Sequence, residues 1–245
     1  MTLEEEQRKL QLRKNPKGKG RLDVTDRGRG LFEYSKIFGN NPKGNITNME
    51  GLIMDYVQRQ RHAVWVDLGC GHGIGLREGK KYLEEKGIGR RLRTYGYDAL
   101  PNDTSTIGET TPDVLELLAE KYAPVLIQGN METAVFKEKP DIVTCVFALL
   151  WTKNPLRVFS NAATQANIGA VLCFNGMQFM HLPENNVFSM IRKTGSLPGF
   201  EIITYTGSKL VARKTQELDD FAYGFRLVST CKDWPYLARY ERRRA

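Results

Sequence analysis

The sequence has no long apolar segment. Its longest nearly apolar run, Ile142–Trp151, is far shorter than the roughly 18 residues that a membrane-spanning helix needs. The first residues, MTLEEEQRKL, lack the apolar segment of a signal peptide. We therefore expect neither membrane insertion nor secretion. A hydrophobic content of 41% is nevertheless enough to fill a core, and a charged content of 26% argues against global disorder.

Cysteine and histidine are also scarce. The 4 cysteines form no Cys-x-x-Cys pair, which argues against a zinc knuckle and against a disulfide framework. The 3 histidines lie far apart in the sequence, so we predict no metal site. Reduced thiols are typical of cytoplasmic proteins, and we expect this localisation. The residues concerned are Cys70, Cys145, Cys173, Cys231, His62, His72 and His181.

Acidic residues are fewer than basic ones, 28 against 36, and the net charge of +8 is unevenly distributed. Residues 1–61 carry a net charge of +5, residues 62–174 carry −1, and residues 175–245 carry +4. Basic flanks around a neutral centre favour an anionic partner, and RNA is our first hypothesis. The alternative is that the surplus of positive charge serves only solubility.

The chain length fits one α/β domain with extensions. We predict a basic N-terminal extension at residues 1–61, a central domain at 62–214 and a C-terminal extension at 215–245, which is basic at its end. Residues 15–30 are rich in Gly, Lys and Arg and are expected to form a basic loop or arm. The extension at 1–61 also includes a helix that leads into the core.

The central part alternates between strand-like and helix-like patterns, which predicts a parallel sheet with helices on both faces. Near the end, two apolar runs flank Gly207-Ser208 and predict an antiparallel pair of strands. Thr47 and Glu50 have the spacing of a capping box, in which both side chains accept from free backbone amides at a helix start. Strands are expected at 62–68, 92–97, 125–128, 141–147, 169–174, 200–206 and 209–214, and helices at 47–61, 76–86, 112–121 and 155–167.

The clearest motif is Asp67-Leu68-Gly69-Cys70-Gly71-His72-Gly73, which follows a predicted strand and opens a predicted helix. Open α/β sheets bind ligands at such strand-to-helix turns. Glycines let the backbone approach a ligand without a clash at Cβ. The dinucleotide fingerprint Gly-x-Gly-x-x-Gly fails here in all three registers, because its last position falls on Ile74, Leu76 or Glu78.

The pattern Asp-x-Gly-x-Gly-x-Gly instead resembles motif I of the class I S-adenosylmethionine-dependent methyltransferases. A carboxylate beside the turn, Asp67, is favourable for the sulfonium and ammonium groups of this cofactor and unfavourable for a pyrophosphate. The alternative is that Asp67 only holds the glycine turn in place. The resemblance implies cofactor contacts from Asp67, Gly69, Cys70, Gly71 and Gly73.

Two later positions extend the resemblance. Asp98 follows a predicted strand, where this family has an acid that accepts from both ribose hydroxyls, although a turn-like insertion at Lys86–Arg91 makes the spacing unusually long. Asn130 and Met131 lie where an acidic segment of the family binds adenine, and Asn130 offers an uncharged acceptor instead. The alternatives are a strand-capping role for Asp98 and a turn role for Asn130.

The segment Asp141–Trp151, DIVTCVFALLW, resembles the fourth-strand motif of these enzymes. The resemblance implies that Phe147 contacts the cofactor and that Leu150 and Trp151 line the acceptor pocket. The segment shares features with small-molecule methyltransferases and with the messenger-RNA cap guanine-N7 enzymes, but Leu150 replaces the histidine of the latter. The alternative is that this stretch is plain core.

The resemblance covers about residues 62–214. It implies a Rossmann-like class I methyltransferase fold with three layers, in which a mainly parallel seven-stranded sheet has an antiparallel edge strand. It also implies S-adenosyl-L-methionine as the cofactor, and no acid or base stands out as catalytic. We predict RNA or another macromolecule as the acceptor. The alternatives are a small-molecule O- or N-methyltransferase and a catalytically inactive nucleic-acid-binding scaffold.

Overall fold

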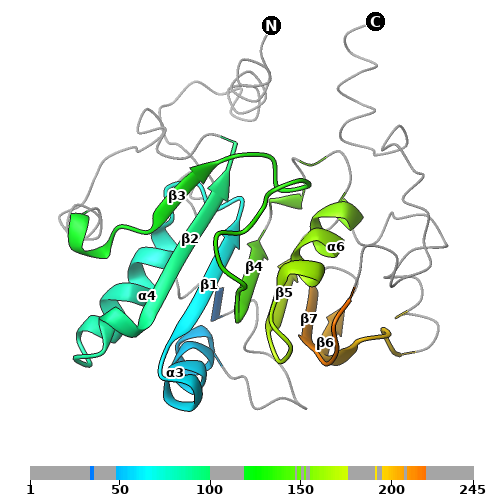
Figure 1. Cartoon of the computed structure of the whole chain (residues 1–245), viewed down its shortest axis with the longest axis horizontal. Coiled ribbons are helices and arrows are strands. Elements are labelled where there is room, and N and C mark those ends of the chain that lie inside the picture. The colour runs from blue at the N-terminus through cyan, green and yellow to red at the C-terminus, as the bar shows by residue number, and fades with distance from the viewer. Residues whose placement is uncertain are drawn as a thin grey trace, which may run out of the picture.

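The computed structural model describes residues 34–35, 48–99, 119–146, 148–149, 152, 155–175, 191, 195–206 and 209–218. Its centre is a seven-stranded sheet with the strand order β3-β2-β1-β4-β5-β7-β6, shown in Figure 1. The strands are β1 (Ala63–Leu68), β2 (Leu92–Asp98), β3 (Val125–Gln128), β4 (Ile142–Val146), β5 (Val171–Asn175), β6 (Phe200–Thr206) and β7 (Lys209–Lys214).

Most neighbouring strands of this sheet are parallel. The pairs β1–β2, β1–β4, β2–β3 and β4–β5 are parallel, whereas β7 runs antiparallel to both β5 and β6. This confirms the predicted mainly parallel sheet with an antiparallel end. The reversed strand, β7, lies one position inside the edge, and β6 is the edge strand. All seven predicted strands are present, most of them within two residues of the expected bounds.

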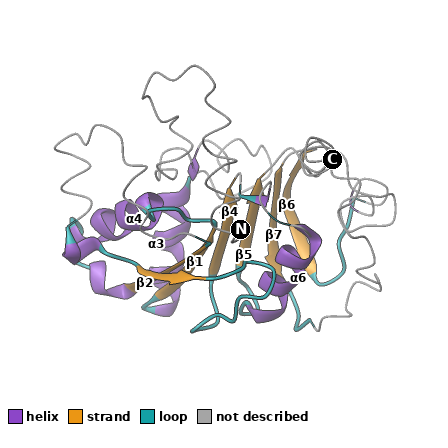
Figure 2. Ribbon diagram, turned by 90° about the horizontal axis from the view of Figure 1, so that it is seen from above, coloured by secondary structure: helices purple, strands orange, loops and turns teal. Residues whose placement is uncertain are grey.

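Helices cover both faces of the sheet, as Figure 2 shows. Alternate residues of β1 point to opposite sides. Ala63 and Trp65 pack in one buried cluster with residues of α3 (Met49–Gln60) and α4 (Ile74–Glu84). Val64 and Val66 pack in a second cluster with residues of α6 (Pro155–Gln165). The two short 3-10 helices are η2 (Gly89–Arg91) and η4 (Glu120–Tyr122).

Two helix starts differ from the sequence-based expectation. The N-cap of α3 is Asn48, whose Oδ1 accepts from the amide of Gly51 at 2.6 Å, so the predicted capping box on Thr47 is wrong. The carboxylate of Glu50 accepts instead from Ser35 Oγ, at 2.6 Å. Helix α4 begins at Ile74, two residues earlier than expected, because Gly73 adopts a left-handed conformation as its N-cap. Most of the helix expected at 112–121 lies outside the described residues.

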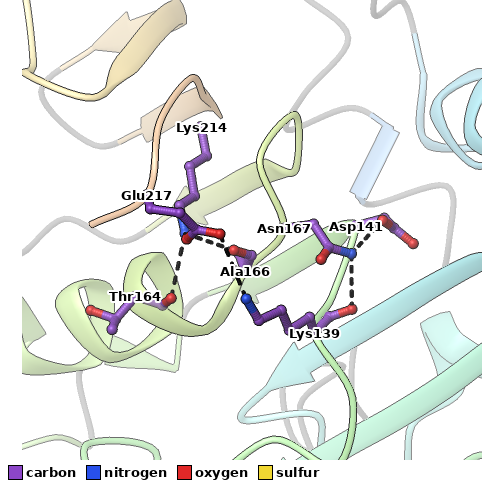
Figure 3. A network of polar contacts seen from close by, with 7 residues as sticks. All are labelled: Lys139, Asp141, Thr164, Ala166, Asn167, Lys214 and Glu217. Carbon is purple, nitrogen blue, oxygen red and sulfur yellow. Dashed lines mark hydrogen bonds and ion pairs between the residues drawn. The ribbon is translucent and has the colours of Figure 1, made fainter. Parts of the chain in front are cut away.

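A polar network joins the elements at the amino-terminal end of the parallel strands, as Figure 3 shows. Lys214 is fully buried, and its Nζ donates to the carbonyls of Ala166 at 2.7 Å and Thr164 at 3.4 Å, near the end of α6. Asn167 donates to Asp141 Oδ1 at 2.9 Å, while the other carboxylate oxygen of Asp141 accepts from the amide of Val64. The network therefore links α6 to β1, β4 and β7, far from the opposite, carboxyl edge of the sheet.

Neither a membrane-spanning helix nor a metal-binding cluster occurs among the described residues. None of the described helices is both long and apolar enough to cross a bilayer. The described part of the chain also contains no cluster of three metal-ligating side chains.

Candidate active site

Those predicted site residues that the structure describes lie at or next to the carboxyl ends of β1, β2 and β3. In the sheet register, Leu68 pairs with Tyr97, and Asp98 pairs with Gln128. Two backbone hydrogen bonds continue the pairing beyond the strands: the amide of Gly69 donates to the carbonyl of Tyr97 at 2.7 Å, and that of Gly129 donates to the carbonyl of Asp98 at 2.9 Å. Three segments that are far apart in the sequence thus form one edge.

The glycine turn depends on glycine for its conformation. Gly69, Gly71 and Gly73 have φ values of +74°, +53° and +67°, which side chains strongly disfavour. Space is restricted as well, because a Cβ on Gly69 would lie 2.1 Å from Ala148 Cβ and 3.4 Å from Met131 Sδ. The turn is closed by the amide of Gly73, which donates to the carbonyl of Cys70 at 2.9 Å. The backbone of the turn after β1 therefore passes directly beside the segments that follow β3 and β4.

Asp98 is connected directly to this turn. Its Oδ2 accepts from the amide of Gly71 at 2.9 Å, and the residue is partly exposed at the end of β2. A carboxylate that accepts from a backbone amide is fixed in place by a charge-assisted hydrogen bond. This hydrogen bond thus joins the acid at the end of β2 to the turn after β1.

Asp67 is buried below the turn, with an exposed fraction of 1%. Its Oδ1 accepts from Thr144 Oγ1 at 2.6 Å, and its Oδ2 accepts from the hydroxyl of Tyr34 at 2.8 Å. Burial raises the pKa of Asp67 to about 7, although both donors stabilise the carboxylate and act in the opposite direction. The charge of Asp98 is a smaller contribution to this rise in the pKa. The Asp67 carboxyl group therefore titrates near neutral pH.

The side chain of Cys70 belongs to the core rather than to the site. The residue is 3% exposed, and a Cβ added to Gly96 of β2 would lie only 2.4 Å from Cys70 Sγ. Burial raises the pKa of this thiol well above its usual value. Any contact of Cys70 with a ligand is therefore left to its backbone.

Asn130 and Met131 lie in a turn directly after β3. Asn130 Oδ1 accepts from the amide of Glu132 at 2.8 Å, which is the geometry of an Asx turn. The loop is held on α6 by Asn161, whose Nδ2 donates to the carbonyls of Ala134 at 2.9 Å and Met131 at 3.3 Å. Asn130 thus has the turn role that the sequence left as the alternative, and the residue is exposed.

Three predicted residues lie outside the described part of the chain, namely Phe147, Leu150 and Trp151. Their described neighbours Ala148 and Leu149 are buried, and Ala148 lies beside Gly69. The segment after β4 therefore contributes to the same edge of the sheet.

Sequence reasoning missed the residues that hold Asp67. Thr144 belongs to the fourth-strand motif, but nothing in the motif shows that its hydroxyl donates to Asp67. Tyr34 lies 33 positions before Asp67, in a segment that none of the motifs includes. No pattern in the sequence could connect Tyr34 with Asp67, because their contact is purely tertiary.

Comparisons with known proteins agree with this architecture. The sequence model of a family described as "Methyltransferase domain" matches residues 45–177, which is more than half of the chain. No curated protein matches the sequence.

Several solved structures are similar at low identity. The plantazolicin methyltransferase BpumL, solved with SAH, aligns at 13% identity over 60% of this chain and 50% of that chain, with a TM-score of 0.38. The amino pentose methyltransferase CalS10 from Micromonospora echinaspora aligns at 18% identity over 68% of this chain and 63% of that chain, with a TM-score of 0.34. The magnesium protoporphyrin IX methyltransferase ChlM from Synechocystis PCC 6803 aligns at 16% identity over 75% of this chain and 94% of that chain, with a TM-score of 0.40.

The chain thus spans half of the length of the first of these enzymes and less than two thirds of the second. At these identities and TM-scores, none of the three structures indicates an acceptor. The family match is a different kind of finding, since it covers the glycine turn and the ends of β1 to β5. The chain therefore belongs to the methyltransferase-domain family, and its strand order and motifs make it a class I member.

Proposed function

We propose that this chain transfers a methyl group from S-adenosylmethionine to an acceptor at the carboxyl edge of β1, β2 and β3. The observation that carries the proposal is the hydrogen bond from the amide of Gly71 to Asp98 Oδ2. It joins two parts that fit such a cofactor, a turn whose three glycines carry no Cβ and a fixed acidic acceptor. A nucleoside at this edge therefore meets glycine backbone and a carboxylate, because the side chains of Cys70 and His72 in the turn are buried.

The residues at the edge fit the chemistry of the cofactor. In our proposal, Asp98 accepts from the two ribose hydroxyls, and the backbone of Gly69, Cys70, Gly71 and Gly73 allows close approach of the ligand. Asn130 and Met131 face the adenine, Asn130 as a polar partner of the exocyclic amine. Phe147 is proposed as a further wall of the cofactor site.

Asp67 contributes by charge rather than by direct contact, because both of its oxygens already accept from protein hydroxyls. A buried anion beside the turn stabilises a cationic group bound above it. When bound, S-adenosylmethionine would supply a methyl group on a positively charged sulfur: the acceptor atom would attack the methyl carbon in line, and the neutral thioether would leave. The protein then contributes orientation and exclusion of water, and we assign no general base.

Asp98 gives the direct test of this proposal. We expect Asp98→Ala to weaken S-adenosylmethionine binding roughly tenfold or more, because hydrogen bonds to charged groups contribute about 1.5–3 kcal/mol. Asp98→Asn should lose less of this affinity, since the amide oxygen of asparagine can still accept from the amide of Gly71. Isothermal titration calorimetry measures both affinities. Asp55→Ala, which removes an aspartate on α3, is the matched control, and an unchanged affinity of Asp98→Ala would remove Asp98 from the site.

For the acceptor, we propose RNA, on the basis of the basic flanks of the sequence. Most residues of the flanks, including 1–33 and 219–245, lie outside the described residues, so this proposal rests on charge alone. The second candidate is a small molecule, for which the apolar residues Phe147, Leu150 and Trp151 would form the pocket. Labelled methyl donor incubated with cell extract, followed by separation of RNA, protein and small molecules, distinguishes the two.

The basic C-terminus provides a quantitative test. Replacing Arg242, Arg243 and Arg244 by glutamine should lower RNA affinity equally for different sequences, because phosphate contacts do not depend on the base. On single strands, the slope of log affinity against log salt should fall by up to about 0.7 for each phosphate that an arginine no longer neutralises. RNA binding at several salt concentrations measures the slope, and S-adenosylmethionine affinity should stay constant. If the parent protein shows no salt-sensitive RNA binding, the RNA proposal fails and a small molecule becomes the favoured acceptor.

A further inference from the structure

Tyr34 is a buried residue that lies outside the segment matched by the methyltransferase family. The family match begins at residue 45, so the family assigns no role to Tyr34. Its side chain is 3% exposed, and its ring packs edge-on against Trp65 of β1, with ring centroids 5.8 Å apart. The next residue, Ser35, bonds to the start of α3 through Glu50 and through the amide of Met49. The pair of residues is thus docked on the sheet from outside the family core.

The hydroxyl of Tyr34 completes a chain of hydrogen bonds around Asp67. Trp65 Nε1 donates to Thr144 Oγ1 at 2.8 Å, so the single hydroxyl hydrogen of Thr144 is available for Asp67 Oδ1. Tyr34 donates to the other carboxylate oxygen at 2.8 Å. Two donors, one from β4 and one from the N-terminal segment, therefore fix the orientation of a carboxyl group that is itself in β1.

We propose that Tyr34 is a positioning residue for the cofactor site, which holds the Asp67 carboxylate in its charged form beneath the glycine turn. The inference rests on the proposed function, because it assumes that the charge of Asp67 favours the cationic cofactor. It assigns a role to a part of the N-terminal segment that the family pattern does not include. Through Tyr34, docking of this segment and binding of the cofactor stabilise each other.

The surroundings of Asp67 make its charge sensitive to this donor. In the described part of the chain, the other titratable groups that interact with Asp67 are Asp98, Cys70 and Cys145. Burial raises the pKa of both thiols well above the usual value, so they are uncharged near neutral pH. Asp98 also raises the pKa of Asp67. The hydroxyls of Tyr34 and Thr144 act against burial and against Asp98, and loss of either should raise the pKa of Asp67 above about 7.

The test is the affinity for S-adenosylmethionine of Tyr34→Phe relative to the parent protein, measured by calorimetry from pH 6 to pH 9. Phenylalanine keeps the ring on Trp65 and removes only the hydroxyl. If the pKa of Asp67 rises by about one and the cofactor prefers the ionised form, affinity falls roughly ninefold at pH 6 and roughly fivefold at pH 7. Near pH 9 the two proteins should bind almost equally. Taking the ratio at each pH cancels the titration of the cofactor itself.

Tyr56→Phe is the matched control. Tyr56 is a buried tyrosine of the same core cluster, and its hydroxyl donates to the carbonyl of Gly169 at the other end of the sheet. The S-adenosylmethionine affinity of Tyr56→Phe, divided by that of the parent protein, should not depend on pH. Thermal unfolding without ligand confirms that both variants are folded before binding is compared.

Each outcome decides between the alternatives. A loss of affinity for Tyr34→Phe that decreases from pH 6 to pH 9 supports the positioning role. A ratio that is close to one, or that is reduced equally at every pH, overturns it and leaves Tyr34 as a packing residue. If the parent protein binds no S-adenosylmethionine at any pH, the proposed function fails, and the positioning role fails with it.

Discussion

Replacing Gly69 by alanine is expected to lower the melting temperature by about 10 °C, one of the two largest effects that we predict. The added Cβ would lie 2.1 Å from Ala148 Cβ, well inside van der Waals contact, and the segments after β1 and β4 would have to separate. The φ of +74° adds a second penalty, because a residue with a Cβ is strained there. The two terms together amount to about 4 kcal/mol of unfolding free energy, measured by thermal or urea unfolding.

Two further variants separate the clash from the backbone strain. In a double-mutant cycle, Ala148→Gly should recover the steric part of the loss in Gly69→Ala, about 1–3 kcal/mol, and leave the conformational part. Gly129→Ala is the matched control at the same edge of the sheet. Its φ is not in the left-handed region and nothing lies within 4 Å of the added Cβ, so its stability should stay near that of the parent protein. If the double variant lost as much unfolding free energy as Gly69→Ala, the destabilisation would be due to the backbone strain at φ alone.

The positions of the strands along the chain could be predicted from the sequence because each strand carries a local pattern. The apolar run after His62 has the β-branched and aromatic residues that favour strands, and the three glycines after it need the positive φ values that they have in the structure. The family resemblance placed Asp98 at the end of the second strand, and Asp98 lies beside the turn because the carboxyl ends of neighbouring parallel strands lie at the same edge. These inferences use short-range rules together with one rule of topology.

The details that sequence reasoning missed depend on tertiary contacts. At the start of α3, Thr47 and Asn48 are both good N-cap residues, and the choice of Asn48 is accompanied by the contact of Ser35 with Glu50. The two hydrogen bonds to Asp67 come from residues 33 positions before it and 77 positions after it. The position of the Cys70 side chain is also set by a tertiary contact: the sequence shows only that Cys70 lies in the turn, and in the structure its side chain packs against β2. No local periodicity encodes any of these contacts.

The opposite end of the sheet gives the second large effect. Lys214→Met is expected to cost about 3 kcal/mol of unfolding free energy, because hydrogen bonds from a charged donor contribute about 1.5–3 kcal/mol each. The variant removes the donor for the carbonyls of Ala166 and Thr164 and for Glu217 Oε2 at 3.0 Å. It also removes a cation from the end of α6, where positive charge is favourable. For a chain of this size, the melting temperature should fall by about 6–12 °C.

Lys139→Met is the control that tests whether burial causes this effect. Both lysines form an ion pair with Glu217, but the Lys139 side chain is 62% exposed and its Nζ lies 3.6 Å from Glu217 Oε1, whereas Lys214 is fully buried. Exposed ion pairs contribute at most about 1 kcal/mol, so Lys139→Met should shift the melting temperature by no more than about 2–4 °C. Equal shifts for the two variants would show that the shared partner Glu217, rather than the buried carbonyls of α6, accounts for the stability. Because the network lies at the amino-terminal end of the parallel strands, S-adenosylmethionine affinity at temperatures where Lys214→Met is folded should match that of the parent protein.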